Sequence, residues 1–278
     1  MPRPVAPACG WSGAVPPDLP PSLGSRLFRL WRIPATGFAF AALGLGGLAL
    51  AVLCFPLLRA LAPDELTGRR RTQRAISLVF QGYLLMLRLL GLITLEVEGR
   101  AQIKACRGKL VVANHPTLLD VVLLMALVRN AQCVVKHQLW SNWFLGPVVR
   151  AAGYIRNDIE GEAFVAACRQ ALAEGSNLII FPEGTRSVPG QPLRLQRGFA
   201  NIALLVPADL QLLRLQCRPI TLVKGEPWWR VPERRANFRV MAGETLPVAP
   251  FLACGPRAIG ARRLTSHLQE YWGQERDD

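Results

Sequence analysis

A histidine and an aspartate five positions apart are the residues of this chain best suited to chemistry. They are His115 and Asp120, and they follow the apolar stretch Leu110–Ala113. A carboxylate bonded to one imidazole nitrogen fixes the tautomer and leaves the other nitrogen free as a base. Imidazole has an unperturbed pKa of about 6.5, so it can accept a proton at neutral pH. From these residues alone the pair has two interpretations, which are general-base catalysis by His115 and a capping arrangement at the start of a helix.

A covalent intermediate with the substrate has no obvious carrier residue in this sequence. The chain contains no Gly-x-Ser-x-Gly elbow, and no serine or cysteine lies between residues 114 and 120. The hydroxyl of a substrate is therefore the group that His115 is expected to activate.

A second polar turn follows another apolar stretch, Leu178–Phe181. Gly184 permits a tight turn with exposed backbone N–H groups, and Thr185 and Ser187 add hydroxyls. Arg186 offers a planar fork of donors that matches phosphate. The turn indicates an anion-binding site, and the alternative is an ordinary turn with a solvated salt bridge.

Short apolar runs that alternate with helical segments must position these turns. The expected strands are Leu110–Ala113, Cys133–Val135, Leu178–Phe181, Ile220–Val223 and Phe238–Met241. The expected helices are Thr117–Val128, Glu162–Glu174 with Gly175 as its C-cap, and Arg257–Trp272. This alternation predicts an α/β fold with a mixed, largely parallel sheet flanked by helices. Both turns would then lie at the carboxyl edge of the sheet, where ligands bind in such folds.

The two motifs together resemble the lysophospholipid acyltransferase family, typified by the 1-acylglycerol-3-phosphate acyltransferases, over residues 75 to 250. The resemblance implies that His115 is the general base and Asp120 its partner. It implies that the acceptor's phosphate and glycerol bind at Glu183, Gly184, Thr185 and Arg186, with Asn114 and Lys136 completing the substrate-binding set. The acyl donor would be acyl-CoA or acyl carrier protein, and no metal or prosthetic group is implied.

Other stretches match the family less fully. Arg156 precedes Asp158, whereas family members often have the arginine after the aspartate, so no binding role is carried onto Arg156. His137 has no comparable partner and is interpreted as a surface or packing histidine. The run Lys224–Arg230 resembles acyltransferases encoded with bacterial aryl-polyene-type lipid pathways, and in that subgroup the acceptor need not be lysophosphatidic acid.

The segment Ala35–Leu58 contains no charged residue and is long enough to cross a bilayer as a helix. The alternative for this segment is a buried core helix. Residues 1–33 are expected to form a Pro-rich disordered tail, residues 34–60 a transmembrane or membrane-inserted helix, and residues 61–278 the acyltransferase domain. Arg59, Arg69, Arg70, Arg71 and Arg74 follow the segment, against Arg26, Arg29 and Arg32 shortly before it. This favours a bacterial inner-membrane protein with its catalytic domain in the cytoplasm.

The amphipathic segment 75–92 has two open interpretations, as an interfacial membrane helix or as a cover for the sheet. The formal charge of +14 predicts an affinity for phosphate. Nucleic acid is not the expected partner, because the arginines cluster near the apolar segment without a recognised reading motif. Seven cysteines without a paired spacing indicate neither a disulfide framework nor a metal site.

Three further functions stay open from the sequence alone. The first is an acyltransferase for a non-glycerolipid acceptor. The second is a non-catalytic membrane adaptor that holds lipid or an acidic carrier protein. The third is a thioesterase or lipid hydrolase, in which the same base would activate water. The sequence makes no prediction of the oligomeric state.

Overall fold

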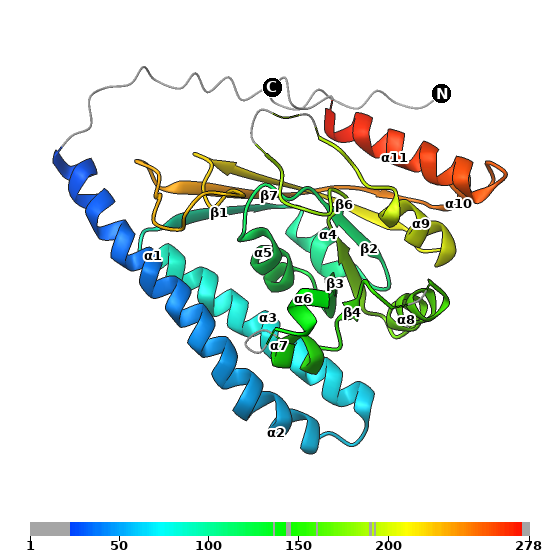
Figure 1. Ribbon diagram of the computed structural model, residues 1–278, viewed down its shortest axis with the longest axis horizontal. Coiled ribbons are helices and arrows are strands. Elements are labelled where there is room, and N and C mark those ends of the chain that lie inside the picture. The colour runs from blue at the N-terminus through cyan, green and yellow to red at the C-terminus, as the bar shows by residue number, and fades with distance from the viewer. Residues whose placement is uncertain are drawn as a thin grey trace.

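The fold is a seven-stranded sheet with helices on both faces (Figure 1). It was obtained as a computed structural model that describes residues 23–273, except 136, 143–145, 160, 189–190 and 192. The strand order is β1-β7-β6-β2-β5-β3-β4. The strands are β1 (Ile93–Glu98), β2 (Leu110–Ala113), β3 (Ala131–Val135), β4 (Ile155–Arg156), β5 (Asn177–Ile180), β6 (Leu210–Arg218) and β7 (Ala236–Leu246).

All neighbouring strands run parallel except β6 and β7, which are antiparallel. This confirms the predicted mixed, largely parallel sheet. Strands were correctly expected at β2, β3 and β5, and β7 extends the expected strand at 238–241 in both directions. The strand expected at Ile220–Val223 is wrong. The preceding residues 210–218 form β6 instead, and Leu222 has a left-handed φ of 55° that no strand accommodates.

Alternate residues of the central strands enter two separate cores. Val111 and Ile179 face one core, whereas Leu110 and Leu178 face the other. Burial on both faces explains why these strands read as continuous apolar runs.

Helices α3 (Glu65–Leu89), α4 (Arg100–Ala105) and α5 (Asp120–Leu127) contribute side chains to the first core. The second core is covered by α8 (Gly161–Ala173), α9 (Gly198–Leu205) and α11 (Arg257–Gly273). The remaining short helices are α6 (His137–Trp140), α7 (Gly146–Ala151) and α10 (Ala249–Leu252).

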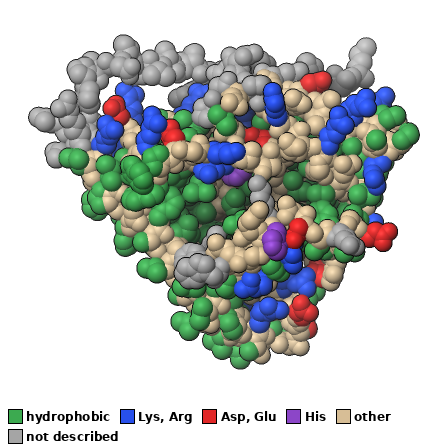
Figure 2. Space-filling view, in the orientation of Figure 1, with side chains coloured by type: hydrophobic (Ala, Val, Ile, Leu, Met, Phe, Trp, Pro, Cys, Tyr) green, Lys and Arg blue, Asp and Glu red, His purple; other side chains and the backbone are tan. Residues whose placement is uncertain are grey.

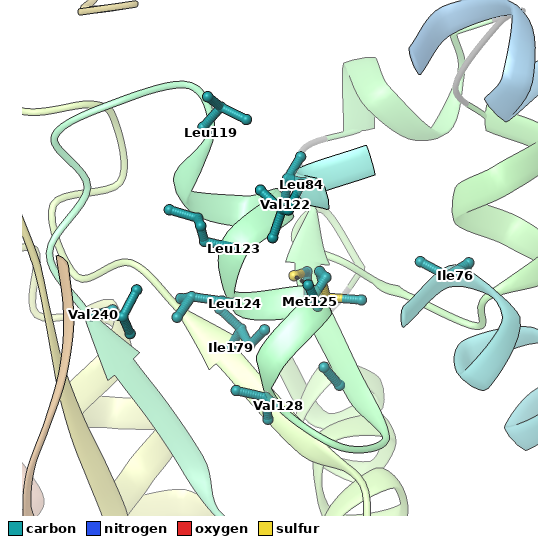
Figure 3. Close-up of a cluster of buried hydrophobic side chains, with 14 of the residues drawn as sticks. Ile76, Leu84, Leu119, Val122, Leu123, Leu124, Met125, Val128, Ile179 and Val240 are labelled. Carbon is teal, nitrogen blue, oxygen red and sulfur yellow. Dashed lines mark hydrogen bonds between the residues drawn. The ribbon is translucent and has the colours of Figure 1, made fainter. Parts of the chain in front are cut away.

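Helix α5 is enclosed on nearly all sides, as Figure 3 shows. Leu124 packs toward Ile179 and Val240 of the sheet, while Val122 lies close to Leu84 of α3. Each such buried side chain stabilises the fold by about 1.5–3 kcal/mol relative to exposure. This packing holds the first turn of α5, which carries Asp120, against the end of the sheet.

Several helix boundaries differ from those expected. Helix α5 begins at Asp120 rather than Thr117, and α3 begins at Glu65 rather than near residue 75. Asp64 explains the early start of α3, because its carboxylate caps the helix by accepting a 2.8 Å hydrogen bond from the Thr67 N–H. The helix expected at 162–174 agrees with α8 within one residue, and Gly175, with φ of 80°, follows it as the predicted cap.

The N-terminal helix begins earlier than the sequence suggested. Helix α1 (Leu23–Ala49) continues through a π-helical turn, Leu50–Cys54, into α2 (Phe55–Ala60). Residues 23–33, expected to belong to a disordered tail, are therefore helical, and residues 1–22 lie outside the described residues. Two contacts hold this end of the helix. Trp31 Nε1 donates to the Leu90 carbonyl at 3.0 Å, and Arg32 Nη1 donates to the Pro232 carbonyl at 3.1 Å.

The continuous helix has one face on the domain and one face outward. Ala39 and Phe55 are buried against the domain, whereas Leu45 is 68% and Leu53 is 71% exposed. Figure 2 shows hydrophobic side chains gathered along the side of the molecule that α1 and α2 form. By length and composition, residues Phe28–Ala60 could cross a membrane. The outward apolar face indicates membrane association.

Candidate active site

Three strands bring the candidate residues to one edge of the sheet. Strand β2 ends directly before Asn114 and His115, and β5 ends just before the turn that contains Glu183. Asn114 joins β2 to β6. Its Nδ2 donates to the Leu215 carbonyl at 2.9 Å, and its Oδ1 accepts from the Leu215 N–H at 2.7 Å. The Asn114 amide therefore continues the ladder between the two strands and fixes the residue that precedes His115.

The His115 and Asp120 side chains are in direct contact. His115 Nδ1 lies 2.8 Å from Asp120 Oδ2. Asp120 also accepts hydrogen bonds from the Thr117 N–H at 2.6 Å and the Thr117 hydroxyl at 2.6 Å. An ionised carboxylate can only accept hydrogen bonds, so in this contact the hydrogen lies on His115 Nδ1, and Nε2 carries the free lone pair.

The two side chains of the pair differ in how far they are exposed to solvent. The Asp120 side chain is 1% exposed, whereas that of His115 is 15% exposed. The imidazole stacks on the Phe181 ring, with centroids 4.2 Å apart. Asp120 is thus shielded from water while the histidine reaches the surface of the site. This arrangement can orient a base and stabilise the imidazolium that forms when it accepts a proton.

Thr117 is a site residue that the sequence interpretation missed. Its backbone and hydroxyl supply two of the three hydrogen bonds to Asp120. The available signal was a threonine three residues before an aspartate at a helix start, a spacing at which such side chains commonly bond the local backbone.

Glu183 connects the two polar turns. Its Oε1 accepts a 2.9 Å hydrogen bond from the His115 backbone N–H, and its Oε2 accepts a 2.6 Å bond from the Ser187 hydroxyl. The Ser187 backbone N–H in turn donates to the His115 carbonyl at 2.8 Å. Glu183 is buried, and both of its oxygens are engaged in this network. Glu183 therefore holds the His115 backbone in place through these hydrogen bonds.

The rest of the turn is more open. Gly184 has a left-handed φ of 67°, and Gly184 and Thr185 are both exposed. Arg186 Nη1 donates to the carbonyls of Leu222 at 3.0 Å and Val223 at 3.2 Å. A guanidinium has three further N–H donors on Nε and Nη2. The loop after β6 thus holds Arg186 close to the site. These two contacts do not use the N–H groups on Nε and Nη2 of the guanidinium.

Of two further residues considered in the sequence analysis, Lys136 lies outside the residues that the structure describes, and His137 lies elsewhere. His137 is exposed and forms its own group with Arg156, at 3.1 Å, and Asp158, at 3.0 Å. The bidentate hydrogen bonds from Arg156 lower the pKa of Asp158 and raise the pKa of Arg156. His137 is thus a surface histidine, as expected.

An apolar pocket of about 70 Å³ adjoins the site. Its walls come from α1, α3, the start of α5 and the loop after β6, and they include Leu118, Leu119 and Leu222. Figure 2 shows a hollow with hydrophobic walls near the centre of this face of the molecule. Arg32 also lines the pocket, and its buried Nε has no hydrogen-bond partner within the described residues.

No cluster of three or more potential metal ligands occurs among the described residues. The ionisable side chains described at the site are one histidine, two carboxylates and one arginine, and the carboxylates are already bonded to His115 and its neighbours. These side chains are able to transfer a proton and to bind an anion.

Comparison with known proteins agrees with this geometry. The family described as Acyltransferase matches residues 94–221. A 1-acyl-sn-glycerol-3-phosphate acyltransferase of Helicobacter pylori is 31% identical over 124 residues, which are 42% of this chain and 49% of that protein. A protein of the same name from Cocos nucifera is 31% identical over 126 residues, or 43% of this chain and 38% of that protein. The matched region spans about half the length of these relatives, or less.

The fold has a solved counterpart. The crystal structure of the 1-acyl-sn-glycerophosphate (LPA) acyltransferase PlsC from Thermotoga maritima superposes with a TM-score of 0.64 at 18% identity. The match covers 90% of this chain and 98% of the other. The matched region contains both polar turns, and the comparisons lead to one conclusion: residues 94–221 form an acyltransferase-family domain similar to that of the 1-acylglycerol-3-phosphate acyltransferases.

Proposed function

We propose that this protein is a membrane-bound O-acyltransferase that moves a fatty acyl group from a thioester to the hydroxyl of a lysophosphatidic acid-like acceptor. The observation that carries the proposal is the 2.8 Å contact between His115 Nδ1 and Asp120, which leaves Nε2 free at the surface of the site. The relatives' printed names support the acceptor class. Acyl-CoA or acyl carrier protein would supply the thioester.

In the proposed reaction, His115 Nε2 takes the proton of the acceptor hydroxyl as its oxygen attacks the thioester carbonyl. The tetrahedral intermediate then expels the thiolate, which receives the proton from the imidazolium. Asp120 stabilises the imidazolium between these two steps. No covalent acyl-enzyme is required, so the absence of a serine or cysteine within residues 114–120 is consistent with this route.

Substrate binding would divide between the polar turn and the apolar pocket. Arg186, held by the carbonyls of Leu222 and Val223, is placed to give its remaining N–H donors to the acceptor phosphate. Gly184 and Thr185 add exposed groups on the same turn. A few carbons of an acyl chain would occupy the apolar pocket beside Leu118 and Leu119. The outward apolar face of α1 would present this opening to the bilayer.

How deeply the continuous helix of α1 and α2 enters the membrane is also part of the proposal. A helix whose inner face packs on the domain at Ala39 and Phe55 cannot leave the domain without losing those contacts. This favours a helix that lies within one leaflet over one that crosses the bilayer alone. The proposed location is the bacterial inner membrane with the α/β domain in the cytoplasm.

The proposal is tested by acyl transfer from detergent-solubilised protein, read by mass spectrometry. Wild type and His115→Ala are each offered acyl-CoA and acyl carrier protein donors with lysophosphatidic acid. The variant is expected to lose activity on the order of 10³-fold or more. His137→Ala is the matched control, because His137 also contacts an aspartate, Asp158, at 3.0 Å but lies on the exposed surface. It is expected to retain activity.

The other functions give different products in the same assay. A hydrolase would release free fatty acid without an acylated acceptor. An adaptor would yield no product from wild type with any acceptor. An enzyme of a specialised lipid pathway, such as an aryl-polyene-type pathway, would acylate a component of a total lipid extract and leave lysophosphatidic acid unchanged. Equal activity of wild type and His115→Ala would remove His115 from the mechanism.

A further inference from the structure

A groove of about 610 Å³ lies on the α3 face of the molecule, away from the site described above. It is bounded by α3 on one side and by α4 and the end of α5 on the other. Its floor includes the buried side chains of Leu84, Ala126 and Val128. On its α3 wall, Leu78 and Leu85 are 58% and 52% exposed. The groove therefore combines an apolar interior with a lip of exposed leucines.

Six cations line this groove. Arg74 and Arg88 lie on α3, and Arg100 and Lys104 lie on α4. Arg107 lies between α4 and β2, and Arg129 lies between α5 and β3. All six are exposed, and no carboxylate is found among the described residues that line the groove. Within the described part of the chain, none of these six side chains makes a hydrogen bond or ion pair with protein.

Six cations without a partner among the described residues are thus gathered around one groove. Elsewhere the chain pairs exposed and half-buried arginines with carboxylates, as Arg69 does with Glu174 at 3.1 Å and Arg156 does with Asp158 at 2.7 Å. Six like charges around one concavity repel one another and focus a positive potential inside it. An anion with several charged oxygens would relieve that repulsion and accept hydrogen bonds from the guanidinium forks.

The groove cannot be part of the proposed acyl-transfer site. It is built from residues that precede strands, such as Arg107 before β2 and Asn130 before β3, whereas His115 follows the end of β2. The groove and His115 therefore lie at opposite edges of the sheet. Helix α5 connects them, with Asp120 at one end and Leu127 at the other. At about 1.5 Å per residue, the helix separates the two sites by about 10 Å along its axis alone.

We propose that this groove is a second lipid site, which binds the phosphate headgroup of an anionic phospholipid and so anchors and orients the protein on the membrane. The six cations would hold the phosphate oxygens. Leu78 and Leu85, on the same wall as Arg74 and Arg88, would contact the first carbons of the acyl chains. An anionic lipid matches this combination better than an acidic protein does, because α3 follows directly from the helix that carries the outward apolar face. The inference stands independently of the acyl-transfer proposal.

The test measures binding to vesicles of phosphatidylcholine alone and of phosphatidylcholine with phosphatidylglycerol, at near-physiological salt. The variant Arg88→Gln/Lys104→Gln/Arg107→Gln removes three groove charges. The matched control Arg257→Gln/Arg262→Gln/Arg263→Gln removes three charges from α11, which covers the other core. With each groove cation contributing up to about fivefold, the groove variant is expected to bind anionic vesicles roughly ten- to a hundredfold more weakly. The control is expected to change less than threefold, and binding to phosphatidylcholine should be unchanged throughout.

A second comparison separates a site from diffuse attraction. Leu78→Ser/Leu85→Ser leaves the charge unaltered and is expected to weaken binding to anionic vesicles severalfold, as an amphiphilic ligand requires. Millimolar inorganic phosphate is expected not to displace the lipid. Equal losses in the groove and α11 variants, no loss in the groove variant, or full displacement by inorganic phosphate would each overturn the assignment. So would selective binding of an acidic carrier protein in place of anionic vesicles. Circular dichroism on every variant confirms that its fold is intact.

Discussion

The Glu183 carboxylate accepts a 2.9 Å hydrogen bond from the backbone N–H of His115, across the gap between the ends of β5 and β2. The resemblance to the family implied a substrate-binding role for Glu183. The structure shows that both of its oxygens are engaged, one by His115 and one by the Ser187 hydroxyl. Glu183 is therefore placed to position the proposed base, and it does so through the backbone.

Glu183→Gln tests this positioning role. The amide retains one acceptor oxygen, but its NH₂ group would face either the His115 N–H or the Ser187 hydroxyl. We expect kcat to fall about 10- to 100-fold, since displacements of about 1 Å have effects of this size. The free energy of unfolding should fall by about 1–3 kcal/mol. Steady-state kinetics and urea denaturation measure the two quantities.

Glu174→Gln is the matched control for this substitution. Glu174 Oε2 accepts a 3.1 Å hydrogen bond from Arg69 Nη1 and lies away from the candidate site. It should lose stability with little change in kcat. If the two variants lose activity in proportion to stability alone, Glu183 has no positioning role beyond folding.

Asp120→Asn removes the charge from a carboxylate that accepts three hydrogen bonds. The asparagine NH₂ would face either the Thr117 donors or His115, and it would favour the imidazole tautomer with the wrong nitrogen protonated. We expect activity to fall on the order of 10³–10⁴-fold. Activity and thermal unfolding should be measured together.

Asp158→Asn offers the corresponding change in the exposed His137 pair. Its activity is expected to stay within about twofold of wild type, because exposed ion pairs contribute about 0–1 kcal/mol. Activity retained by Asp120→Asn would contradict the His–Asp mechanism.

Arg186→Lys separates phosphate recognition from general binding. A lysine keeps the positive charge but loses the planar fork, so it cannot hold the carbonyls of Leu222 and Val223 and a phosphate together. We expect KM for lysophosphatidic acid to rise about tenfold or more, and KM for the acyl donor to change much less. A monoacylglycerol acceptor, which has no phosphate, is the internal control. If KM for both acceptors rises equally, Arg186 is not the phosphate contact.

Gly184→Ala tests whether the backbone of the polar turn matters. The added Cβ would meet Gln196 Cγ at 3.5 Å, an ordinary contact, so the expected cost comes from the φ of 67°. That cost is about 1–2 kcal/mol for a residue with a side chain. Gly198→Ala is the control, because nothing lies within 4 Å of its Cβ and its φ is ordinary. Chemical denaturation should show a loss for the first variant and no loss for the second.

The sequence located the sheet edge and its two turns because the signals there are local. The apolar runs at β2 and β5 are short and lead directly into polar turns, so the relative positions of His115 and Glu183 followed from parallel pairing alone. The contact of His115 with Asp120 was expected from helix geometry. Neither the bond from Glu183 to His115 nor the pairing of Asn114 with Leu215 could be expected. Both depend on side-chain contacts between strands far apart in sequence.

The errors have similar physical causes. The run that contains Gln211 and Arg214 forms β6, although polar residues interrupt it. The buried Gln211 side chain is satisfied by the Gly243 carbonyl at 2.8 Å, a partner on β7 that the sequence does not reveal. Residues 220–223 are more apolar but lie beyond the end of that strand. Likewise, residues 23–33 are helical because Trp31 and Arg32 find partners at Leu90 and Pro232.

Buried thiols predict how stability depends on high pH. Burial raises the pKa of Cys133 to about 12 and that of Cys217 to about 12, from an ordinary value of 9.0. Below pH 9.0 the thiols are protonated in both the folded and unfolded states, so their contribution is fully present. Above it, the unfolded state releases protons that the folded state retains. The free energy of unfolding should therefore fall as pH rises from 9.0 toward 12, by up to about 1.4 kcal/mol per pH unit for each group.

Urea denaturation under reducing conditions at pH 8, 9.5 and 10.5 measures this slope. Cys133→Ala removes one of the groups, so its stability should fall less steeply above pH 9 than that of wild type, even though it starts lower because of the cavity it leaves. Cys254→Ala is the control, since Cys254 is only half-buried.

The raised pKa of Cys217 also bears on mechanism. At pH 8 only about one thiol in ten thousand would be a thiolate, so Cys217→Ala should retain acyl-transfer activity within about twofold, and a large loss would indicate a covalent thioester intermediate.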